Sequence, residues 1–143
     1  AILANATTAQ REQAAAFGRH IGTAFQLMDD LLDYTANAAQ MGKNAGDDLR
    51  EGKPTLPLIY LLENGSNEER LLVRAAIEQN QDLPDDVFSK ILSAVQSSGA
   101  LDYTQAAAKR EADLALSCLK DFPANEASKA LQELCVYSLT RQA

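Results

Sequence analysis

Residues 8–35 read TAQREQAAAFGRHIGTAFQLMDDLLDYT, and this stretch decides the fold class. At about 100° per residue, its apolar side chains gather in one arc of roughly 120°, the width of an ordinary core-facing stripe. The spacing therefore predicts one long amphipathic helix, with Thr7 or Thr8 as the N-cap and Asn37 near its end. The expected core stripe consists of Phe17, Ile21, Ala24, Phe25, Met28, Leu31 and Leu32.

The composition extends the helical prediction to the whole chain of 143 residues. Alanine and leucine together number 45, whereas valine and isoleucine together number 9. Small and straight side chains lose little freedom in a helix, while β-branched ones prefer strands. We therefore expect an all-α protein, and the length suits a single helical domain over 1–143.

Breakers and capping residues divide the rest of the chain into shorter predicted elements. A polar, glycine-containing loop is expected over 37–53. The predicted helices after this loop run from Pro54 to Asn64, over 67–79, 85–98 and 102–121, and from Pro123 to the C-terminus.

The later helices are predicted to serve as packing elements, because their apolar residues repeat at helical spacing. Before Gly99, the stripe is Val87, Ile91, Leu92 and Val95. In the next helix, Leu114, Cys118 and Leu119 are expected to face the core, with Ala107 and Glu111 facing outward. In the last helix, the stripe is Leu131, Leu134, Cys135 and Leu139.

The charge balance and the cysteines exclude several classes of partner. The net charge of −7 argues against nucleic acid and against charge-driven binding to an acidic membrane surface. The longest apolar stretch, 56–62, is too short to span a bilayer. Cys118 and Cys135 lack metal-site spacing, so we expect free thiols in the reducing cytoplasm. His20 is expected to be structural.

The first helix also carries an acidic arc beside its core stripe. Gly22, Gln26, Asp29 and Asp33 fall within about 60°, and Asp30 lies further round. Like charges at i,i+4 repel, and acids near a helix C-terminus oppose the helix dipole. The arc is therefore either a solvated acidic patch or a functional Mg²⁺ site, because Mg²⁺ binds one or two carboxylates together with substrate phosphates.

The loop after this helix favours the functional interpretation. Lys43 and Lys53 each follow a glycine, within reach of the acidic helix end. Lysine ammonium groups bind phosphate as point charges, and glycine allows the backbone to approach a ligand closely. Lys53 precedes Pro54, so we expect it to present a phosphate to the start of a helix. Carboxylates for metal beside lysines for phosphate are what a diphosphate requires.

An ordered set of motifs resembles the trans-prenyltransferases, the polyprenyl diphosphate synthases. FQLMDDLLDY at 25–34 is followed by a Gly-Lys pair at 42–43 and by GDDLREGKPTLP at 46–57. The Asp29-Asp30-x-x-Asp33 run is similar to the second aspartate-rich motif of that family. The sequences of these motifs are most similar to those of the bacterial long-chain synthases, in particular those that make octaprenyl diphosphate.

The resemblance implies the fold, the reaction and the partners. The fold would be the C-terminal part of a prenyltransferase-type helical bundle, in which two aspartate-rich motifs bind several Mg²⁺ ions. The substrates would be an allylic diphosphate and isopentenyl diphosphate, which condense to a long-chain polyprenyl diphosphate. The family also implies a homodimer without an integral membrane segment.

The resemblance also implies roles for particular residues. Asp29 would be the principal metal ligand, with Asp30 and Asp33 contributing directly or through water. Lys43 and Lys53 would contact the allylic diphosphate. Gln26 would line the substrate site, and Phe25 would flank the isoprenoid. Asp47 and Asp48 follow the family pattern and could equally orient either lysine.

The chain departs from the family pattern in one large respect. The first aspartate-rich motif and the residues that hold isopentenyl diphosphate do not occur in it, so we expect an isolated chain to be inactive and to expose apolar surface. Two alternatives remain open: a non-catalytic prenyltransferase-like subunit, and a terpene synthase or head-to-head condensing enzyme. Product length is not readable from these residues.

Overall fold

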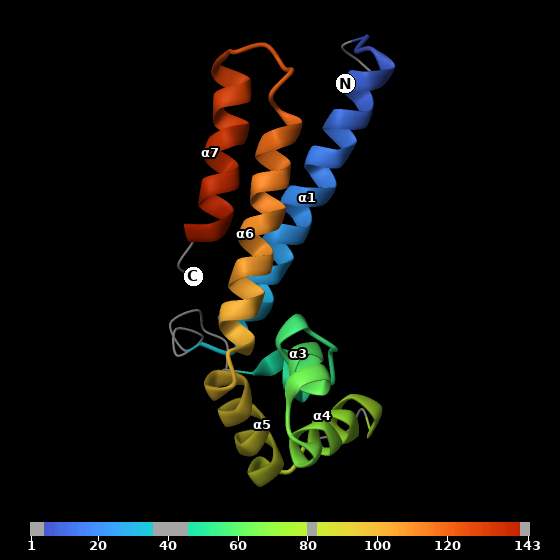
Figure 1. Cartoon of the computed structure of the whole chain (residues 1–143), viewed down its shortest axis with the longest axis vertical. Helices are drawn as coiled ribbons and strands as arrows, with labels where there is room; N and C mark the ends of the chain where they lie inside the picture. Colours follow the sequence, from blue (N-terminus) through green and yellow to red (C-terminus); the bar gives the residue numbers. More distant parts are fainter. Residues whose placement is uncertain (1–4, 36–45, 80–82, 141–143) are drawn as a thin grey trace. The chain divides into compact units, whose positions relative to one another are not determined.

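The computed structural model describes residues 5–35, 46–79 and 83–140, and its regular structure there is entirely helical (Figure 1). The prediction of an all-α protein is therefore confirmed. The helices within the described residues are α1 (Thr8–Asp33), α2 (Asp47–Arg50), α3 (Leu56–Asn64), α4 (Asn67–Gln79), α5 (Asp85–Ser97), α6 (Ala100–Cys118) and α7 (Glu126–Thr140).

The predicted boundaries agree well where a capping residue or a breaker marks a helix end. α4 has the predicted bounds, and α1 and α5 end within two residues of theirs. α6 starts two residues earlier and ends three residues earlier than predicted. α7 begins three residues after Pro123, because Asn125 caps it: the Ser128 N–H donates to Asn125 Oδ1 at 3.0 Å.

The described residues fall into two compact units, the first made of residues 5–28 and 106–140. In the first unit α1, α6 and α7 share a small core. Its buried members are Phe17, Ala115, Leu119 and Cys135. A polar contact also joins two of these helices, since His20 Nδ1 lies 2.7 Å from Glu111 Oε2.

The buried face of α6 differs from the predicted one. Ala107, expected to face outward, is buried, whereas Leu114, expected in the core, is 45% exposed. Leu119 is buried as predicted, and Cys118 is half-buried. Small alanines line the packed face because they allow a close approach of neighbouring helices. The buried residues of α6 are Ala100, Thr104, Ala107, Ala108, Ala112 and Ala115, and the buried Leu119 directly follows the helix.

The expected leucine stripe of α7 is also only partly buried. Cys135 is fully buried and Ser138 lies beside it, whereas Leu131 and Leu134 are 37% and 45% exposed. The buried residues of α7 are therefore the small Cys135 and Ser138 instead of the leucines. Cys118 and Cys135 are both free, as predicted.

The second unit contains the described residues between 29 and 105. Its core is larger and draws on Tyr34 directly after α1, on α2 to α5 and on the start of α6. The buried members are Tyr34, Leu49, Leu58, Leu61, Val73, Ala76, Leu83, Phe88, Ile91, Ala94, Val95 and Ala100. The predicted stripe of α5 is confirmed, since Ile91 and Val95 are buried in this core and Val87 and Leu92 pack against it.

The segment before α3 contains a short helix that the sequence did not reveal. α2 has four residues and lies within the predicted loop; Leu49 anchors it in the core and is fully buried. Gly46 precedes α2 at φ 80°, a left-handed conformation that suits glycine. α3 begins at Leu56 rather than at Pro54, and Pro57 occupies its first turn.

None of the helices in the described ranges is long and apolar enough to cross a membrane.

Candidate functional site

The acidic end of α1 belongs to the second unit and is largely withdrawn from solvent. Asp30 and Asp33 are each 8% exposed, and Asp29 is partly exposed. An ordinary solvated acidic patch would leave all three carboxylates in water. Burying a charged group costs free energy that neighbouring groups must offset, so the acidic end of α1 is more than a solvated patch.

Asp33 anchors the start of α2 through both its side chain and its backbone. The N–H of Asp48 donates to Asp33 Oδ2 at 3.1 Å, and the N–H of Gly46 donates to the Asp33 carbonyl at 2.8 Å. Burial raises the pKa of Asp33 from 3.8 to about 6; the Asp48 N–H opposes this rise, and the charges of Asp48 and Asp47 add to it. The site therefore holds negative charge that a bound cation would stabilise.

Lys53 lies between α2 and α3, in a clasp of two carboxylates. Its Nζ is 2.8 Å from Asp48 Oδ1 and 2.6 Å from Glu51 Oε2, and its side chain is 54% exposed. Hydrogen bonds to Asp48 and Glu51 raise the pKa of Lys53 above its ordinary value, so it is a cation at neutral pH. The expectation that Lys53 sits at a helix start is wrong, because α3 begins only at Leu56.

The sequence left open whether Asp47 or Asp48 orients a lysine, and the structure answers this for Asp48. Asp48 orients Lys53, both through its carboxylate and through its carbonyl, which accepts the Lys53 N–H at 2.9 Å. The Asp47 carbonyl accepts the N–H of Glu51 at 3.0 Å, which closes α2. Lys43, the other predicted phosphate ligand, lies outside the described residues.

Tyr34 and Thr55 are members of this region that sequence reasoning missed. The Tyr34 hydroxyl and Thr55 Oγ1 are 3.0 Å apart, and both residues are buried. The Tyr34 carbonyl accepts a hydrogen bond from Gln96 Nε2 at 3.0 Å. The only sequence signal was position, since Tyr34 directly follows the aspartates and Thr55 follows Lys53 by two residues.

Phe25 and Gln26 lie on α1 in the turn before Asp29, within the first unit. Phe25 is 43% exposed, so its expected place in the core stripe is wrong. Gln26 is also exposed. The other stripe members are buried or half-buried, as predicted.

The carboxylates fit a metal that takes part of its coordination from a ligand. Within the described ranges, no group of three or more His, Cys, Asp or Glu side chains is placed to hold a metal ion. A closed structural metal site of protein ligands is therefore not formed by these residues. Mg²⁺ commonly binds one or two carboxylates and completes its shell with water and phosphate oxygens, and the end of α1 suits that mode.

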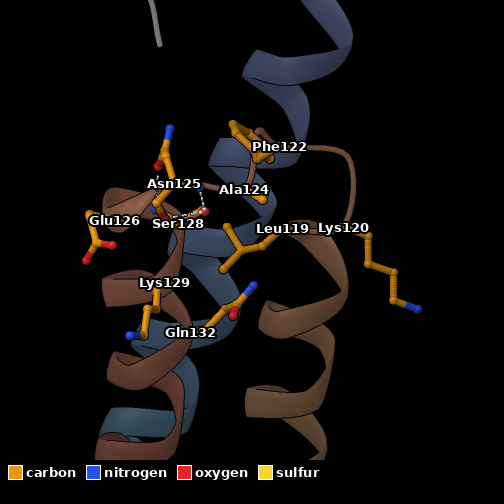
Figure 2. Close-up of a pocket in the computed structure, with 9 residues that line it drawn as sticks. All are labelled: Leu119, Lys120, Phe122, Ala124, Asn125, Glu126, Ser128, Lys129 and Gln132. Atoms are coloured by element: carbon orange, nitrogen blue, oxygen red, sulfur yellow. Dashed lines mark hydrogen bonds between the residues drawn. The ribbon is translucent and has the colours of Figure 1, made fainter.

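A separate pocket lies in the first unit, between the loop after α6 and the first turns of α7 (Figure 2). It has a volume of about 390 Å³, and Lys120 and Lys129 are among its lining residues. Asn125 and Ser128 bond to one another there, as the dashed lines show, and so satisfy the start of α7 themselves. None of the predicted site residues lines this pocket.

Solved structures define the class of protein. The fold matches a polyprenyl synthase from Caulobacter crescentus, in complex with calcium and isoprenyl diphosphate, with a TM-score of 0.85 and 38% identity. It matches a decaprenyl diphosphate synthase from Rhodobacter capsulatus with a TM-score of 0.82 and 30% identity. Each match covers 99% of this chain, against 43% and 42% of the solved chains. The chain thus has the fold of part of a polyprenyl synthase.

Sequence comparison then gives the family. The family model "Polyprenyl synthetase" matches residues 1–95, and the chain belongs to this family. It is 42% identical to octaprenyl diphosphate synthase of Haemophilus influenzae over 141 residues, and 43% identical to that of Escherichia coli over 138. The matches cover 99% and 94% of the chain but only 42% of each relative, so the chain spans less than half of their length.

Proposed function

We propose that the chain forms the diphosphate-binding part of a trans-prenyltransferase. This enzyme would condense an allylic diphosphate with isopentenyl diphosphate to give a long-chain polyprenyl diphosphate, the octaprenyl product being the one expected from the motif wording. One observation carries the proposal. The second unit contains both the buried carboxylates of Asp30 and Asp33 and the partly exposed Lys53, which Asp48 holds in place.

Asp29 is the principal metal ligand in this proposal, and Asp30 and Asp33 add negative charge around it. Bound Mg²⁺ would supply Lewis-acid stabilisation of the charge that develops on the leaving diphosphate. The carboxylates face a ligand that is itself anionic, so without a cation they would repel it. We therefore expect diphosphate binding at this site to depend on the divalent metal.

The lysines bind and orient the allylic diphosphate. The Lys53 ammonium already forms ion pairs with Asp48 and Glu51. A diphosphate that binds Lys53 would therefore replace one of these carboxylates as its partner. Exposed ion pairs contribute only about 0–1 kcal/mol each, so this exchange is inexpensive. Lys43 is assigned the same task on sequence grounds. Pyrophosphate itself takes the proton after carbon–carbon bond formation, so no histidine base is needed.

Gln26 and Phe25 are assigned to substrate binding on the basis of the resemblance. An exposed amide and an exposed ring in the turn before Asp29 suit a substrate with a diphosphate head and an apolar tail. The family match favours chain elongation over the terpene synthase and head-to-head alternatives. The homodimer implied by the resemblance stays a prediction, which analytical ultracentrifugation of the full-length protein would test.

Asp29→Ala in the full-length protein tests the proposal. Turnover should fall by orders of magnitude while helix content, measured by circular dichroism, stays unchanged. Asp86→Ala is the matched control, because Asp86 is an exposed acid on α5 in the same unit. Normal turnover in Asp29→Ala would show that the metal assignment is wrong.

A further inference from the structure

The short segment from Asp48 to Thr55 is fixed at both ends by neighbouring residues of α1's C-terminal end. At one end, the N–H of Asp48 bonds to the Asp33 carboxylate at 3.1 Å. At the other end, Thr55 Oγ1 bonds to the Tyr34 hydroxyl at 3.0 Å. Asp33 and Tyr34 are consecutive, so a single point of the chain braces both ends of the segment.

Lys53 is bonded through its backbone to both of the braced residues. Its N–H donates to the Asp48 carbonyl at 2.9 Å, and its carbonyl accepts the N–H of Thr55 at 2.9 Å. Four hydrogen bonds and the peptide bond between Asp33 and Tyr34 therefore link five residues in a closed ring, with Lys53 on the side opposite that peptide bond. The order around this ring is Asp33, Asp48, Lys53, Thr55 and Tyr34.

The conformation of residues 48–55 must be stabilised by tertiary contacts, because the local structure of this segment is too short to be stable alone. α2 has four residues, which is too short to be stable as an isolated helix. The Lys53 side chain is 54% exposed, so its ion pairs contribute little to the position of its backbone. The Tyr34–Thr55 bond is buried on both sides, and a buried hydrogen bond is costly to leave half made.

Tyr34 is itself immobilised. Its ring is fully buried in the core of the second unit, and its carbonyl accepts the hydrogen bond from Gln96 Nε2. A phenol in that position gives Thr55 a fixed partner. Its hydroxyl bonds to Thr55, and the Thr55 N–H donates to the Lys53 carbonyl, so Tyr34 is linked to Lys53 through that backbone.

We propose that Tyr34 is a positioning residue for the diphosphate-binding lysine, acting through Thr55 on the backbone that presents Lys53. This inference rests on the proposed function, in which Lys53 binds the allylic diphosphate. It assigns Tyr34 no contact with substrate or metal. The proposal makes diphosphate affinity depend on a buried hydroxyl pair that the ligand does not reach.

The test is a double-mutant cycle on Tyr34→Phe and Thr55→Val in the full-length protein. Calorimetry measures binding of inorganic pyrophosphate with Mg²⁺, and steady-state kinetics give KM for each substrate. Each single variant should weaken pyrophosphate binding by about three- to tenfold, and the double variant should lose no more than one single variant. KM for isopentenyl diphosphate should stay constant, and Thr55→Ser, which keeps the hydroxyl, should restore binding.

Thr104→Val is the control for a purely structural effect. Thr104 is also fully buried in the second unit, but its hydroxyl bonds to the Ala100 carbonyl within its own helix. Thr104→Val should lower the melting temperature without changing pyrophosphate affinity. If Tyr34→Phe behaved in the same way, with a lower melting temperature and normal affinity, the positioning role would be overturned.

A further variant separates this inference from the proposed function. If Lys53→Ala weakens pyrophosphate binding but Tyr34→Phe does not, the inference fails and the proposed function stands. If Lys53→Ala binds pyrophosphate normally, the assignment of Lys53 fails and the inference fails with it. Weaker binding in both, with non-additivity between Tyr34 and Thr55, supports both.

Discussion

The carboxylate of Asp33 accepts a hydrogen bond from the backbone N–H of Asp48 at 3.1 Å, although the Asp48 side chain carries the same charge. The N–H groups at the start of α2 attract the Asp33 carboxylate, while the charges of Asp47 and Asp48 repel it. Burial tips the balance, so the pKa of Asp33 rises to about 6. Asp33 therefore holds α2 in place, but its charged form is disfavoured in the absence of a cation.

Asp33 should make stability depend on pH in the metal-free protein. Its pKa is higher in the folded state than in the unfolded state, so the folded state binds the proton more tightly between pH 4 and pH 6. The resulting stabilisation is fully present below about pH 4 and is lost as the pH rises through 6, by up to about 3 kcal/mol.

Asp33→Asn tests this linkage. The amide keeps an acceptor oxygen for the Asp48 N–H but carries no charge, so the free energy of unfolding should vary less between pH 4 and pH 6. Stability at pH 7 should rise by about 1–3 kcal/mol. Denaturant titrations at several pH values measure the effect, with Asp86→Asn as the exposed control. An unchanged slope in Asp33→Asn would mean that this carboxyl does not titrate as described.

Lys53→Ala should weaken allylic diphosphate binding by about ten- to hundredfold in the full-length protein, because a charge-assisted contact contributes roughly 1.5–3 kcal/mol. Binding of isopentenyl diphosphate should change little. Lys90→Ala is the control, since Lys90 is an exposed cation on α5 in the same unit. Separate titrations with the two substrates measure the effect. Equal losses for both would require Lys53 to serve the whole cavity instead of the allylic site.

Lys43→Ala should produce a loss of similar size for the allylic substrate alone. This expectation comes from the Gly-Lys pair at 42–43 and from the resemblance to the family. The lysine follows a glycine and acts through its own charge, so Lys43→Arg should retain more affinity than Lys43→Ala. The same titrations apply. A variant that binds both substrates like the wild type would remove Lys43 from the site.

Gly46→Ala should destabilise the chain. The φ of 80° is strained for any residue with a Cβ, by about 1–2 kcal/mol, and an added Cβ would lie 2.7 Å from Phe88 Cζ. The Phe88 ring also stacks on the Arg50 guanidinium at 4.0 Å, so it cannot shift without disturbing α2. Thermal unfolding measures the loss. Gly18→Ala, where an added Cβ meets nothing within 4 Å, should not lower the melting temperature.

The sequence was sufficient for the helices whose ends carry local signals. α4 lies between the Asn64-Gly65 breaker and a polar stretch, and α5 starts directly after Pro84, so their bounds could be predicted. α2 could not be predicted, because a four-residue helix depends on Leu49 in the core and on Asp33 from another part of the chain. Helix propensity is a local property, so it gives no information about either of these contacts.

The candidate site was predictable in its residue types but not in its internal bonding. Spacing placed Asp29 and Asp33 on adjacent turns, and the glycines pointed to Lys53. The hydrogen-bond partners of Asp33 and Tyr34 are 15 and 21 residues away in sequence, and helical periodicity carries no information about contacts at that separation. For the same reason, the spacing of α6 did not distinguish the packed face of Ala107 from the exposed Leu114.

The central claim is that the acidic end of α1 binds a diphosphate through a divalent metal, and one titration tests it most directly. Inorganic pyrophosphate is titrated into the full-length protein by calorimetry, with Mg²⁺ and with a chelator, for the wild type and for Asp29→Ala. We predict Mg²⁺-dependent binding that weakens at least about tenfold in Asp29→Ala, as expected when a charged partner is removed. Equal affinity in the two proteins, or binding that persists in the chelator, would contradict the account.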